Sequence, residues 1–461
     1  MNDMTVPAKT KIDGTTITKT PFLNEGIVEQ KRQEILHYFH TSFSQYESLF
    51  ECLVDDSTFY LRPNSLRHPL IFYYGHTAVF FINKLNIAQL RKDRVDPALE
   101  DMLAIGVDEM SWDDLDPAHY SWPTVAEVKA YRDKVRNIVD KFIRSCDLTL
   151  PITNQDPLWI IMMGIEHERI HLETSTVLIR ELPLANVQAH SGWSRCKQSG
   201  DAPENSLLEL TGSKVTLGKS RDNPLYGWDN EYGTQVETIQ SFKASKYLVS
   251  NREFLAFVEG GGYTEQSYWS EEGWAWCQGA KISYPHFWVK HETGYRYRSM
   301  LEEFAMPWDW PVDINCLEAE AFCQYKTIQL NKNIALPTEA QWAILRQKVD
   351  ADQPTWDVAP GNINLEHGAS SCPVNKFEFA DGFYDIIGNV WQWSQSEFGG
   401  FAGFVTHPVY DDFSTPTFDG RHNVFKGGCW ASTGNYSIKD SRYAFRRHFF
   451  QHSGLRYVEN A

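Results

Sequence analysis

The chain has 461 residues, too many for one ordinary hydrophobic core, so two or three domains are expected. Its 60 acidic and 43 basic residues give a formal charge of −17, and no segment is rich in Lys and Arg, which argues against a partner nucleic acid. Residues 1–20 lack the apolar stretch of a secretory signal and no apolar run is long enough to span a membrane, so the sequence predicts a cytoplasmic protein with no membrane partner.

Residues 1–20 are expected to form a flexible arm. From Glu25 to Leu53, apolar side chains recur at spacings of three, four or seven residues, the pattern of an amphipathic helix. A second and more apolar helix is predicted over Leu70–Leu85. A third is predicted to begin at Thr124, where Glu127 completes a capping box.

The fourth predicted helix spans Asp156 to Leu182. Asp156 is expected to cap it, Pro157 suits the first helical position, and Pro183 ends it. Four helices within residues 21–185 predict a helical bundle, a fold that builds metal sites from facing helices.

His167 and His171 lie four residues apart on the fourth helix, so both imidazoles are expected on one face, at the spacing of two metal ligands. A polar stripe without a metal is the alternative. The same residues spell the zinc-protease pattern H-E-x-x-H, with Glu168 as the general base, but the extension that would supply a third ligand is missing. The candidate third ligand is His76, the single histidine of the apolar second helix, although such a histidine is often only a core residue.

After Pro183 the pattern changes. Residues 186–206 are predicted to be a linker, and residues 207–461, rich in Trp, Tyr and Gly, an irregular α+β domain. This part is expected to contain a strand at Lys214–Gly218 and helices at Cys316–Lys326 and Thr338–Gln347. The eight cysteines are scattered and are expected to be reduced.

Five motifs follow in order along this second half: Val249–Phe254, Pro311–Val312 with Glu318–Cys323, Leu336–Trp342, Gly388–Trp393 and Lys426–Trp430. Together they resemble the formylglycine-generating-enzyme/sulfatase-modifying family over roughly residues 207–458. The resemblance implies a fold related to C-type lectins. It does not carry over that family's paired catalytic thiols, because Cys429 is the last cysteine.

A three-histidine bundle fused to such a domain resembles the iron-dependent sulfoxide synthases of thiol-histidine biosynthesis, over nearly the whole chain. The resemblance implies a multidomain α and α+β protein, with a DinB-like bundle over residues 21–185 and a formylglycine-generating-enzyme-like domain over residues 207–461. It also implies that His76, His167 and His171 bind Fe(II), leaving coordination positions for a thiolate, dioxygen and a substrate imidazole.

Three segments resemble the ovothiol branch, 5-histidylcysteine sulfoxide synthase: Gly75–Thr77, His167–Glu173 and Arg442–Gln451. Where the ergothioneine branch has Arg-containing loops for γ-glutamylcysteine, this chain has the acidic residues Asp108, Glu109, Asp113 and Asp114, which favour free cysteine. The expected substrates are therefore L-cysteine, L-histidine and dioxygen. The alternatives are an ergothioneine-type synthase acting on trimethylhistidine, a zinc hydrolase, and a binding module without catalysis.

The second domain is expected to close over the open face of the metal and to hold two amino acids. Arg446 and Arg447 are candidates for binding carboxylates, and Trp430, Ser432 and Asn435 for the rim of the substrate site. Structural roles are the alternative for each.

Tyr410 is the nearest candidate for the active-site tyrosine that the resemblance implies after the Trp-Gln-Trp motif. Glu173 is a candidate for orienting a ligand histidine. No methyltransferase follows in this chain, so a separate methyltransferase and a C–S lyase are expected as pathway partners.

Overall fold

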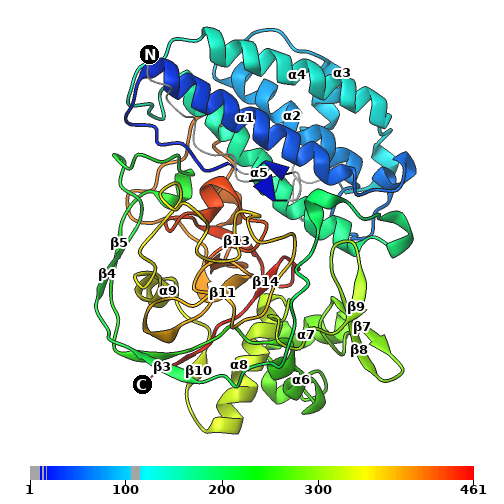
Figure 1. Ribbon diagram of the computed structural model, residues 1–461, viewed down its shortest axis with the longest axis vertical. Helices are drawn as coiled ribbons and strands as arrows, with labels where there is room; N and C mark the ends of the chain where they lie inside the picture. Colours follow the sequence, from blue (N-terminus) through cyan, green and yellow to red (C-terminus); the bar gives the residue numbers. More distant parts are fainter. Residues whose placement is uncertain (1–10, 13–14, 17, 105–114, 461) are drawn as a thin grey trace. The chain divides into compact units, whose positions relative to one another are not determined.

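The computed structural model describes residues 11–12, 15–16, 18–104 and 115–460 (Figure 1). The chain forms two compact units. The first, here called the helical unit, runs as far as Ser194 and includes the short segments Pro224–Tyr226 and Thr433–Asn435. The second, the mixed unit, contains the other residues from Arg195 onward.

Four long helices make up the bundle of the helical unit: α1 (Val28–Phe50), α2 (Leu70–Ile87), α4 (Val125–Ser145) and α5 (Pro157–Glu181). Helix α2 packs against α4 and α5, and α1 packs against the same two helices. A short helix, α3 (Pro97–Met102), lies in the connection between α2 and α4. Near the amino terminus, β1 (Lys11–Ile12) pairs with β2 (Thr15–Thr16). The predicted four-helix bundle is confirmed.

Local signals set the ends of these helices. Thr124 and Glu127 form the predicted capping box of α4, and Pro157 lies in the first turn of α5. Asp156 is the N-cap residue of α5, as predicted, but its side chain makes no capping hydrogen bond. Its carboxylate instead accepts hydrogen bonds from the backbone N–H and the hydroxyl of Thr153, both at 2.7 Å, and so closes the turn before the helix.

Helix α5 is the central helix, with every residue from Leu158 to Arg180 buried. Its buried polar and charged side chains include Glu166, His167, Glu168, Arg169, His171 and Glu173. Because a buried polar group is costly unless another group binds it, the sequence of this helix requires either protein partners or a ligand along its length.

The mixed unit contains two four-stranded sheets, ordered β10-β15-β6-β3 and β13-β12-β11-β14, with a β7-β8-β9 sheet and a β4-β5 hairpin (Figure 1). Pairing is antiparallel except between β11 and β14. The strands are β3 (Leu207–Leu210), β4 (Lys214–Leu217), β5 (Gln235–Thr238), β6 (Phe242–Ser245), β7 (Trp288–His291), β8 (Gly294–Arg298), β9 (Glu303–Ala305), β10 (Ile334–Ala335), β11 (Trp391–Glu397), β12 (His422–Lys426), β13 (Tyr443–Arg446), β14 (Ser453–Gly454) and β15 (Val458–Glu459).

Four helices belong to the mixed unit: α6 (Asn251–Glu259), α7 (Glu271–Ala280), α8 (Cys316–Leu330) and α9 (Glu339–Arg346). The predicted strand β4 and the predicted helices α8 and α9 are confirmed, whereas α6 and α7 were not predicted. All eight cysteines are free, as expected. None of the helices within the described residues has the length and the apolar composition that a membrane-spanning segment needs.

Candidate metal centre

Three buried histidines meet inside the helical unit. His76 comes from α2, and His167 and His171 come from successive turns of α5. One ring nitrogen of each lies within 4.8 Å of the others, and the ring centroids are 4.5 to 5.1 Å apart. The exposed fractions of the three residues are 8, 2 and 3%. The structure therefore brings together the three residues that the sequence singled out as metal ligands.

A backbone carbonyl fixes the tautomer of His76. Its Nδ1 lies 2.6 Å from the carbonyl oxygen of Leu103, which directly follows the short helix α3. A carbonyl oxygen only accepts hydrogen bonds, so Nδ1 carries the proton and Nε2 keeps its lone pair. The Asp96 side chain caps α3 by accepting a hydrogen bond from the N–H of Leu99. This short helix, which the sequence did not predict, thus prepares His76 to act as a ligand through Nε2.

His167 and His171 face each other through their Nε2 atoms, which are 3.2 Å apart. At most one of these nitrogens can donate a proton to the other. Two nitrogens bound to one ion at about 2.1 Å, at a right angle, would be roughly 3.0 Å apart. The observed separation is close to that of neighbouring ligands, so the pair fits the edge of a coordination shell.

Aromatic rings hold two of the imidazoles in place. The Phe80 ring stacks on His167 with the centroids 3.6 Å apart and the planes 9° from parallel, and the Phe72 ring stacks on His76 at 5.0 Å. Burial lowers the pKa of His76 to about 4, and it lowers the pKa values of His167 and His171 well below the usual range, assisted by the neighbouring histidines. All three rings are therefore neutral near pH 7, the form that binds metal ions.

These residues fit a bound cation. The Nε2 atoms of His167 and His171 lie 3.2 Å apart, and the Nε2 lone pair of His76 is free to face the same point among the three imidazoles. Three neutral nitrogen donors match the preference of first-row transition metals for imidazole. The metal-ligand roles of the three histidines nevertheless remain predictions.

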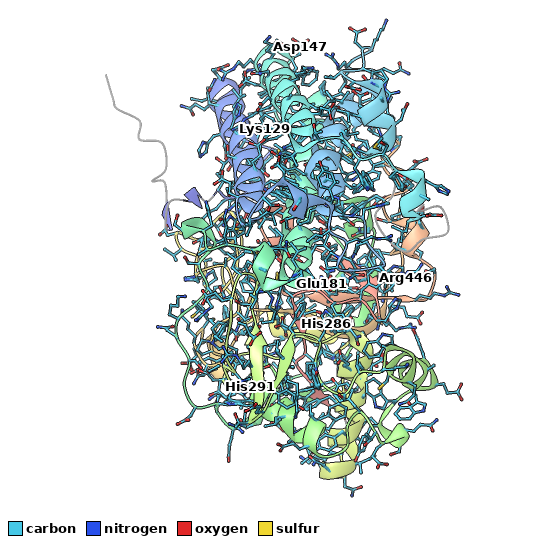
Figure 2. All side chains as sticks on the ribbon, turned by 90° about the vertical axis from the view of Figure 1, so that its right-hand side faces the viewer. Lys129, Asp147, Glu181, His286, His291 and Arg446 are labelled. Atoms are coloured by element: carbon cyan, nitrogen blue, oxygen red, sulfur yellow. The ribbon has the colours of Figure 1, made fainter. Side chains whose placement is uncertain are left out.

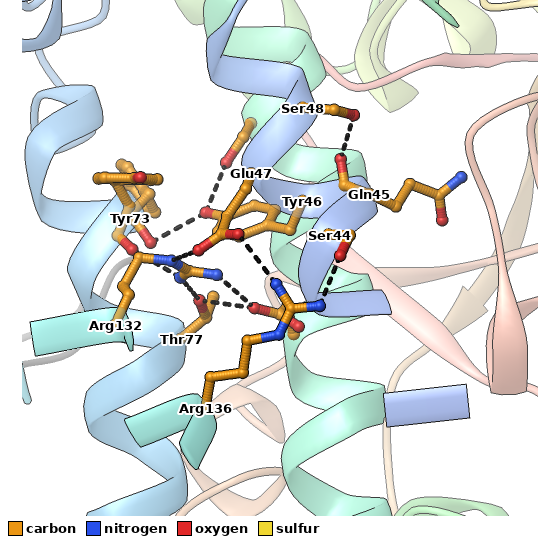
Figure 3. A network of polar contacts seen from close by, with 12 residues as sticks. Ser44, Gln45, Tyr46, Glu47, Ser48, Tyr73, Thr77, Arg132 and Arg136 are labelled. Atoms are coloured by element: carbon orange, nitrogen blue, oxygen red, sulfur yellow. Dashed lines mark hydrogen bonds and ion pairs between the residues drawn. The ribbon is translucent and has the colours of Figure 1, made fainter. Parts of the chain in front are cut away.

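Arg132 of α4 connects the two helices that carry the histidines (Figure 3). Its Nη1 donates to the Thr77 hydroxyl at 2.8 Å, and its Nη2 pairs with Glu168 Oε1 at 3.0 Å. Its Nε pairs with Glu47 Oε1 of α1 at 3.1 Å. Thr77 and Glu168 each directly follow a histidine of the cluster, so one fully buried guanidinium binds the side chains next to His76 and His167.

The same network speaks against the zinc-protease interpretation. Glu168 is the residue to which this interpretation gives the role of general base. It is fully buried, and its Oε1 accepts hydrogen bonds from Arg132 and from Thr77, the latter at 3.2 Å. A general base must reach a water molecule on the metal. Glu168 is placed instead to support the bundle.

Glycines allow the two helices that carry the histidines to approach closely. A Cβ atom on Gly164 of α5 would lie 2.3 Å from the ring of Phe81 on α2. A Cβ atom on Gly75 would lie 2.5 Å from the Leu103 side chain, just where α3 approaches His76. Both residues therefore serve close packing around the histidines rather than flexibility.

Asn435 belongs to the helical unit through the segment Thr433–Asn435. Its backbone N–H donates to Glu166 Oε2 at 2.7 Å, and the Tyr38 hydroxyl donates to Glu166 Oε1 at 2.6 Å. Glu166 directly precedes His167. The structure thus places Asn435, predicted at the rim of the substrate site, against the helix that carries two histidines, although its contact is made by the backbone.

The two predicted carboxylate-binding arginines lie in the mixed unit. Arg447 already has partners there: Glu272 Oε2 at 2.8 Å, Glu397 Oε1 at 3.2 Å and Asn423 Oδ1 at 2.8 Å. Arg446 (Figure 2) ends strand β13 and is half-buried. Because the Arg447 guanidinium is already bound to two carboxylates and an amide oxygen, it has little capacity left for a substrate carboxylate.

Two other predicted rim residues are built into a loop of the mixed unit. Trp430 is buried, with its ring 4.6 Å from that of His452, and Ser432 is buried, with its hydroxyl accepting a hydrogen bond from the N–H of Cys429 at 2.9 Å. These contacts give both residues structural roles, and their substrate contacts remain predictions.

The roles of the remaining two candidates, Tyr410 and Glu173, also stay predictions. Tyr410 is a half-buried residue of the mixed unit, with its ring 5.1 Å from that of Phe413. Glu173 is fully buried on α5, about 200° around the helix axis from His171, and so projects toward a different side of the helix.

Sequence reasoning missed Arg132 and the carbonyl of Leu103. Arg132 had a visible signal, because it lies within the apolar stripe of α4 formed by Val128, Tyr131 and Val135. The Leu103 carbonyl had no signal in the sequence, since every residue has a backbone carbonyl. The four acidic residues that favoured free cysteine, Asp108, Glu109, Asp113 and Asp114, lie outside the described residues.

Comparison with known families covers both units. Residues 196–461 match the family described as sulfatase-modifying factor enzyme 1-like domain, and residues 38–175 match the DinB superfamily. A DinB-like helical domain is therefore followed by a sulfatase-modifying-factor-like domain, which confirms the predicted fold class. The second match covers the part of the chain that holds all three histidines.

Several characterised proteins are similar to this chain. A hercynine oxygenase from Mycolicibacterium smegmatis is 28% identical over 432 residues, which is 87% of this chain and 93% of the relative. A hercynine oxygenase from Mycobacterium tuberculosis is 30% identical over 224 residues, 44% of this chain and 48% of the relative. Ergothioneine biosynthesis protein 1 from Schizosaccharomyces pombe is 23% identical over 88% of this chain, which spans 52% of that protein.

Proposed function

We propose that this protein, which belongs to the sulfatase-modifying factor enzyme 1-like family, is an iron-dependent oxidoreductase of the sulfoxide synthase type. It would use dioxygen to join a thiol sulfur to the imidazole ring of a histidine-derived substrate. The observation that carries the proposal is the buried cluster of His76, His167 and His171. The similarity to a hercynine oxygenase over 87% of the chain supports it.

The three histidines would hold Fe(II) through neutral imidazole nitrogens, and a bound iron would supply the activation of dioxygen. The Leu103 carbonyl keeps the proton of His76 on Nδ1, away from the cluster. Arg132 holds Thr77 and Glu168 beside the ligands, and Phe80 covers one face of the His167 ring and excludes water from it. These residues preorganise the donor nitrogens before any metal or substrate binds.

The proposed reaction needs no external reductant. Forming the carbon–sulfur bond removes two electrons and two protons from the thiol and the imidazole ring. Oxidation of the resulting thioether to a sulfoxide removes two more electrons. One dioxygen molecule accepts all four electrons, with one oxygen atom entering the sulfoxide and the other leaving as water.

Two substrate pairs are candidates. The names of the relatives favour an ergothioneine-type reaction, in which trimethylhistidine reacts with cysteine or γ-glutamylcysteine. The motifs Gly75–Thr77 and Arg442–Gln451, which resemble the ovothiol branch, favour L-histidine and L-cysteine as the second candidate. Either product is a sulfoxide, so a separate C–S lyase is an expected pathway partner, and in the second case a methyltransferase as well.

The test is an assay of the Fe(II)-loaded full chain with each substrate pair, with and without dioxygen, in which mass spectrometry detects the sulfoxide. Formation of a sulfoxide from one pair, only with iron and only with dioxygen, is the expected result and identifies the substrates. Turnover without dioxygen, or hydrolysis of peptides by the zinc-loaded protein, would contradict the proposal. His76→Ala is the matched inactive variant, and His40→Ala, on α1, is the control.

A further inference from the structure

A cavity of about 350 Å³ lies within the mixed unit, apart from the histidine cluster. Its walls come from strand β4, helix α9, the end of β12 and the segment before β13. Helix α9 packs against both β4 and β12. The volume falls within the range of small-molecule sites, and none of the steps proposed above uses it.

The walls of this cavity carry an excess of positive charge. Its cationic residues are Lys214, Arg346, Lys426, Lys439 and Arg442, and its acidic residues are Glu339 and Asp440. This is the opposite of the chain as a whole, whose formal charge is −17. A concave surface with charges of one sign concentrates ligands of the other sign.

Among the residues that line the cavity, one carboxylate faces two cations. Glu339 binds Arg442 through both oxygens, with Nε–Oε1 at 3.0 Å and Nη2–Oε2 at 3.1 Å. The ammonium group of Lys426 lies 3.4 Å from Glu339 Oε1. All three residues are buried. Lys426 and Arg442 share this carboxylate, and the lining has one further acidic residue, Asp440, so an anionic ligand would help to balance the five cations of the walls.

The cavity also has hydrogen-bond donors without acceptors. Trp342 Nε1 and Arg346 Nε belong to residues that line it, and both atoms are buried without a hydrogen-bond partner in the described part of the chain. The other two nitrogens of Arg346 are already bound: Nη1 donates to the Val349 carbonyl at 2.9 Å, and Nη2 donates to the Ala351 carbonyl at 3.2 Å and pairs with Asp352 Oδ1 at 3.3 Å. Lys214 and Lys439 are exposed, and no described residue forms an ion pair with their ammonium groups. Buried donors are usually satisfied in folded proteins, so these point to a ligand that accepts hydrogen bonds.

We propose that this cavity is a binding site for a small organic oxyanion, a carboxylate or a phosphate ester. Trp342 and Arg346 donate hydrogen bonds to the oxyanion, and Lys214 and Lys439 attract it at the opening. The apolar side chains of Val215, Leu217 and Phe401 line the same cavity and accommodate the carbon skeleton of the ligand. The site is independent of the iron chemistry proposed for the helical unit.

The experiment is isothermal titration calorimetry of the full chain at low ionic strength with succinate, glycerol 3-phosphate and the uncharged analogue succinamide. We expect saturable binding of one or both anions, no binding of succinamide, and weaker binding as salt is added. The double variant Lys214→Ala/Lys439→Ala is expected to weaken binding about tenfold. Lys129→Ala, which removes an exposed lysine of the helical unit (Figure 2), should leave it unchanged.

Trp342→Phe removes the Nε1–H donor together with the five-membered ring of a buried indole. It is expected to weaken binding several-fold and, because it leaves a cavity in a packed core, to lower the thermal unfolding temperature of the free protein as well. Replacement of the exposed lysine pair should leave that temperature unchanged, and so separates the effect on binding from the effect on stability. Preference for glycerol 3-phosphate or for succinate would identify the ligand as a phosphate ester or a carboxylate. No saturable binding of either anion, or binding unaffected by both the lysine pair and Trp342→Phe, would overturn the proposal.

Discussion

Arg132 and Glu168 form an ion pair with the Nη2–Oε1 distance at 3.0 Å, and neither side chain is exposed. The pair joins α4 to α5, the helix that carries two of the histidines, and the same guanidinium binds the hydroxyl of Thr77 next to His76. The pair therefore couples the stability of the bundle to the position of the histidine nitrogens.

Arg132→Met is expected to lower the free energy of unfolding by about 3–5 kcal/mol, because it leaves the Glu168 carboxylate buried without its partner. Chemical denaturation measures this. Arg132→Met/Glu168→Gln should recover part of the loss. On the same helix, Arg144→Met removes an exposed ion pair with Asp140 and should cost less than about 1 kcal/mol. Equal losses for the two single variants would show that the buried pair has no special role.

His76→Ala, His167→Ala and His171→Ala are each expected to weaken Fe(II) binding by more than about 100-fold, since loss of a ligand costs more than loss of a group that orients one. Equilibrium dialysis with metal analysis gives the affinity directly, without any assay of turnover. His40→Ala is the control and should leave Fe(II) binding unchanged, because His40 lies outside the histidine cluster and pairs with Asp140 on α4. Unchanged Fe(II) affinity of His76→Ala would show that His76 is not a metal ligand.

Gly164→Ala is expected to destabilise the protein by about 1–3 kcal/mol, because the new methyl group would lie 2.3 Å from the Phe81 ring in a packed core. The same substitution at Gly279, in helix α7, meets no atom within 4 Å and is expected to stabilise by up to about 1 kcal/mol through helix propensity. Thermal unfolding of the two variants should therefore shift in opposite directions. A shift in the same direction would refute the close approach of α2 and α5 at Gly164.

Burial raises the pKa of Glu318 to about 7, even though the Tyr263 hydroxyl donates a hydrogen bond to its carboxylate at 2.5 Å. The folded protein therefore holds this proton more tightly than the unfolded chain, whose carboxyl titrates near 4.5. The stabilising contribution is complete below pH 4.5 and is lost as the pH rises through about 7, at roughly 1.4 kcal/mol per pH unit at most.

The free energy of unfolding, measured between pH 5 and pH 7.5 by denaturant titration, tests this. Glu318→Gln keeps the shape of the side chain and has no proton to lose, so its stability should fall less steeply than that of the unmodified protein over this range. Glu292→Gln, which changes an exposed carboxylate in the mixed unit, should leave the slope unchanged. Identical slopes for all three proteins would contradict the assigned pKa.

The sequence by itself determined the bundle and the identity of the clustered histidines. The helical period, the capping box at Thr124 and the prolines around α5 are local signals, and they fixed the helices before any packing was known. The four-residue spacing put His167 and His171 on one face, and an apolar helix with one histidine pointed to His76. Asp156 stands at the N-cap position of α5, but its carboxylate accepts hydrogen bonds from Thr153 and none from the first turn of the helix.

Only the tertiary structure decided which distant groups serve these histidines. Arg132 meets Glu168, and Leu103 meets His76, because of the angles and the rotation at which separate helices pack. The charged cavity likewise depends on β4, α9 and the chain before β13 coming together from three parts of the sequence. Contacts of this kind arise from packing across the whole fold, and no local pattern of residues encodes them.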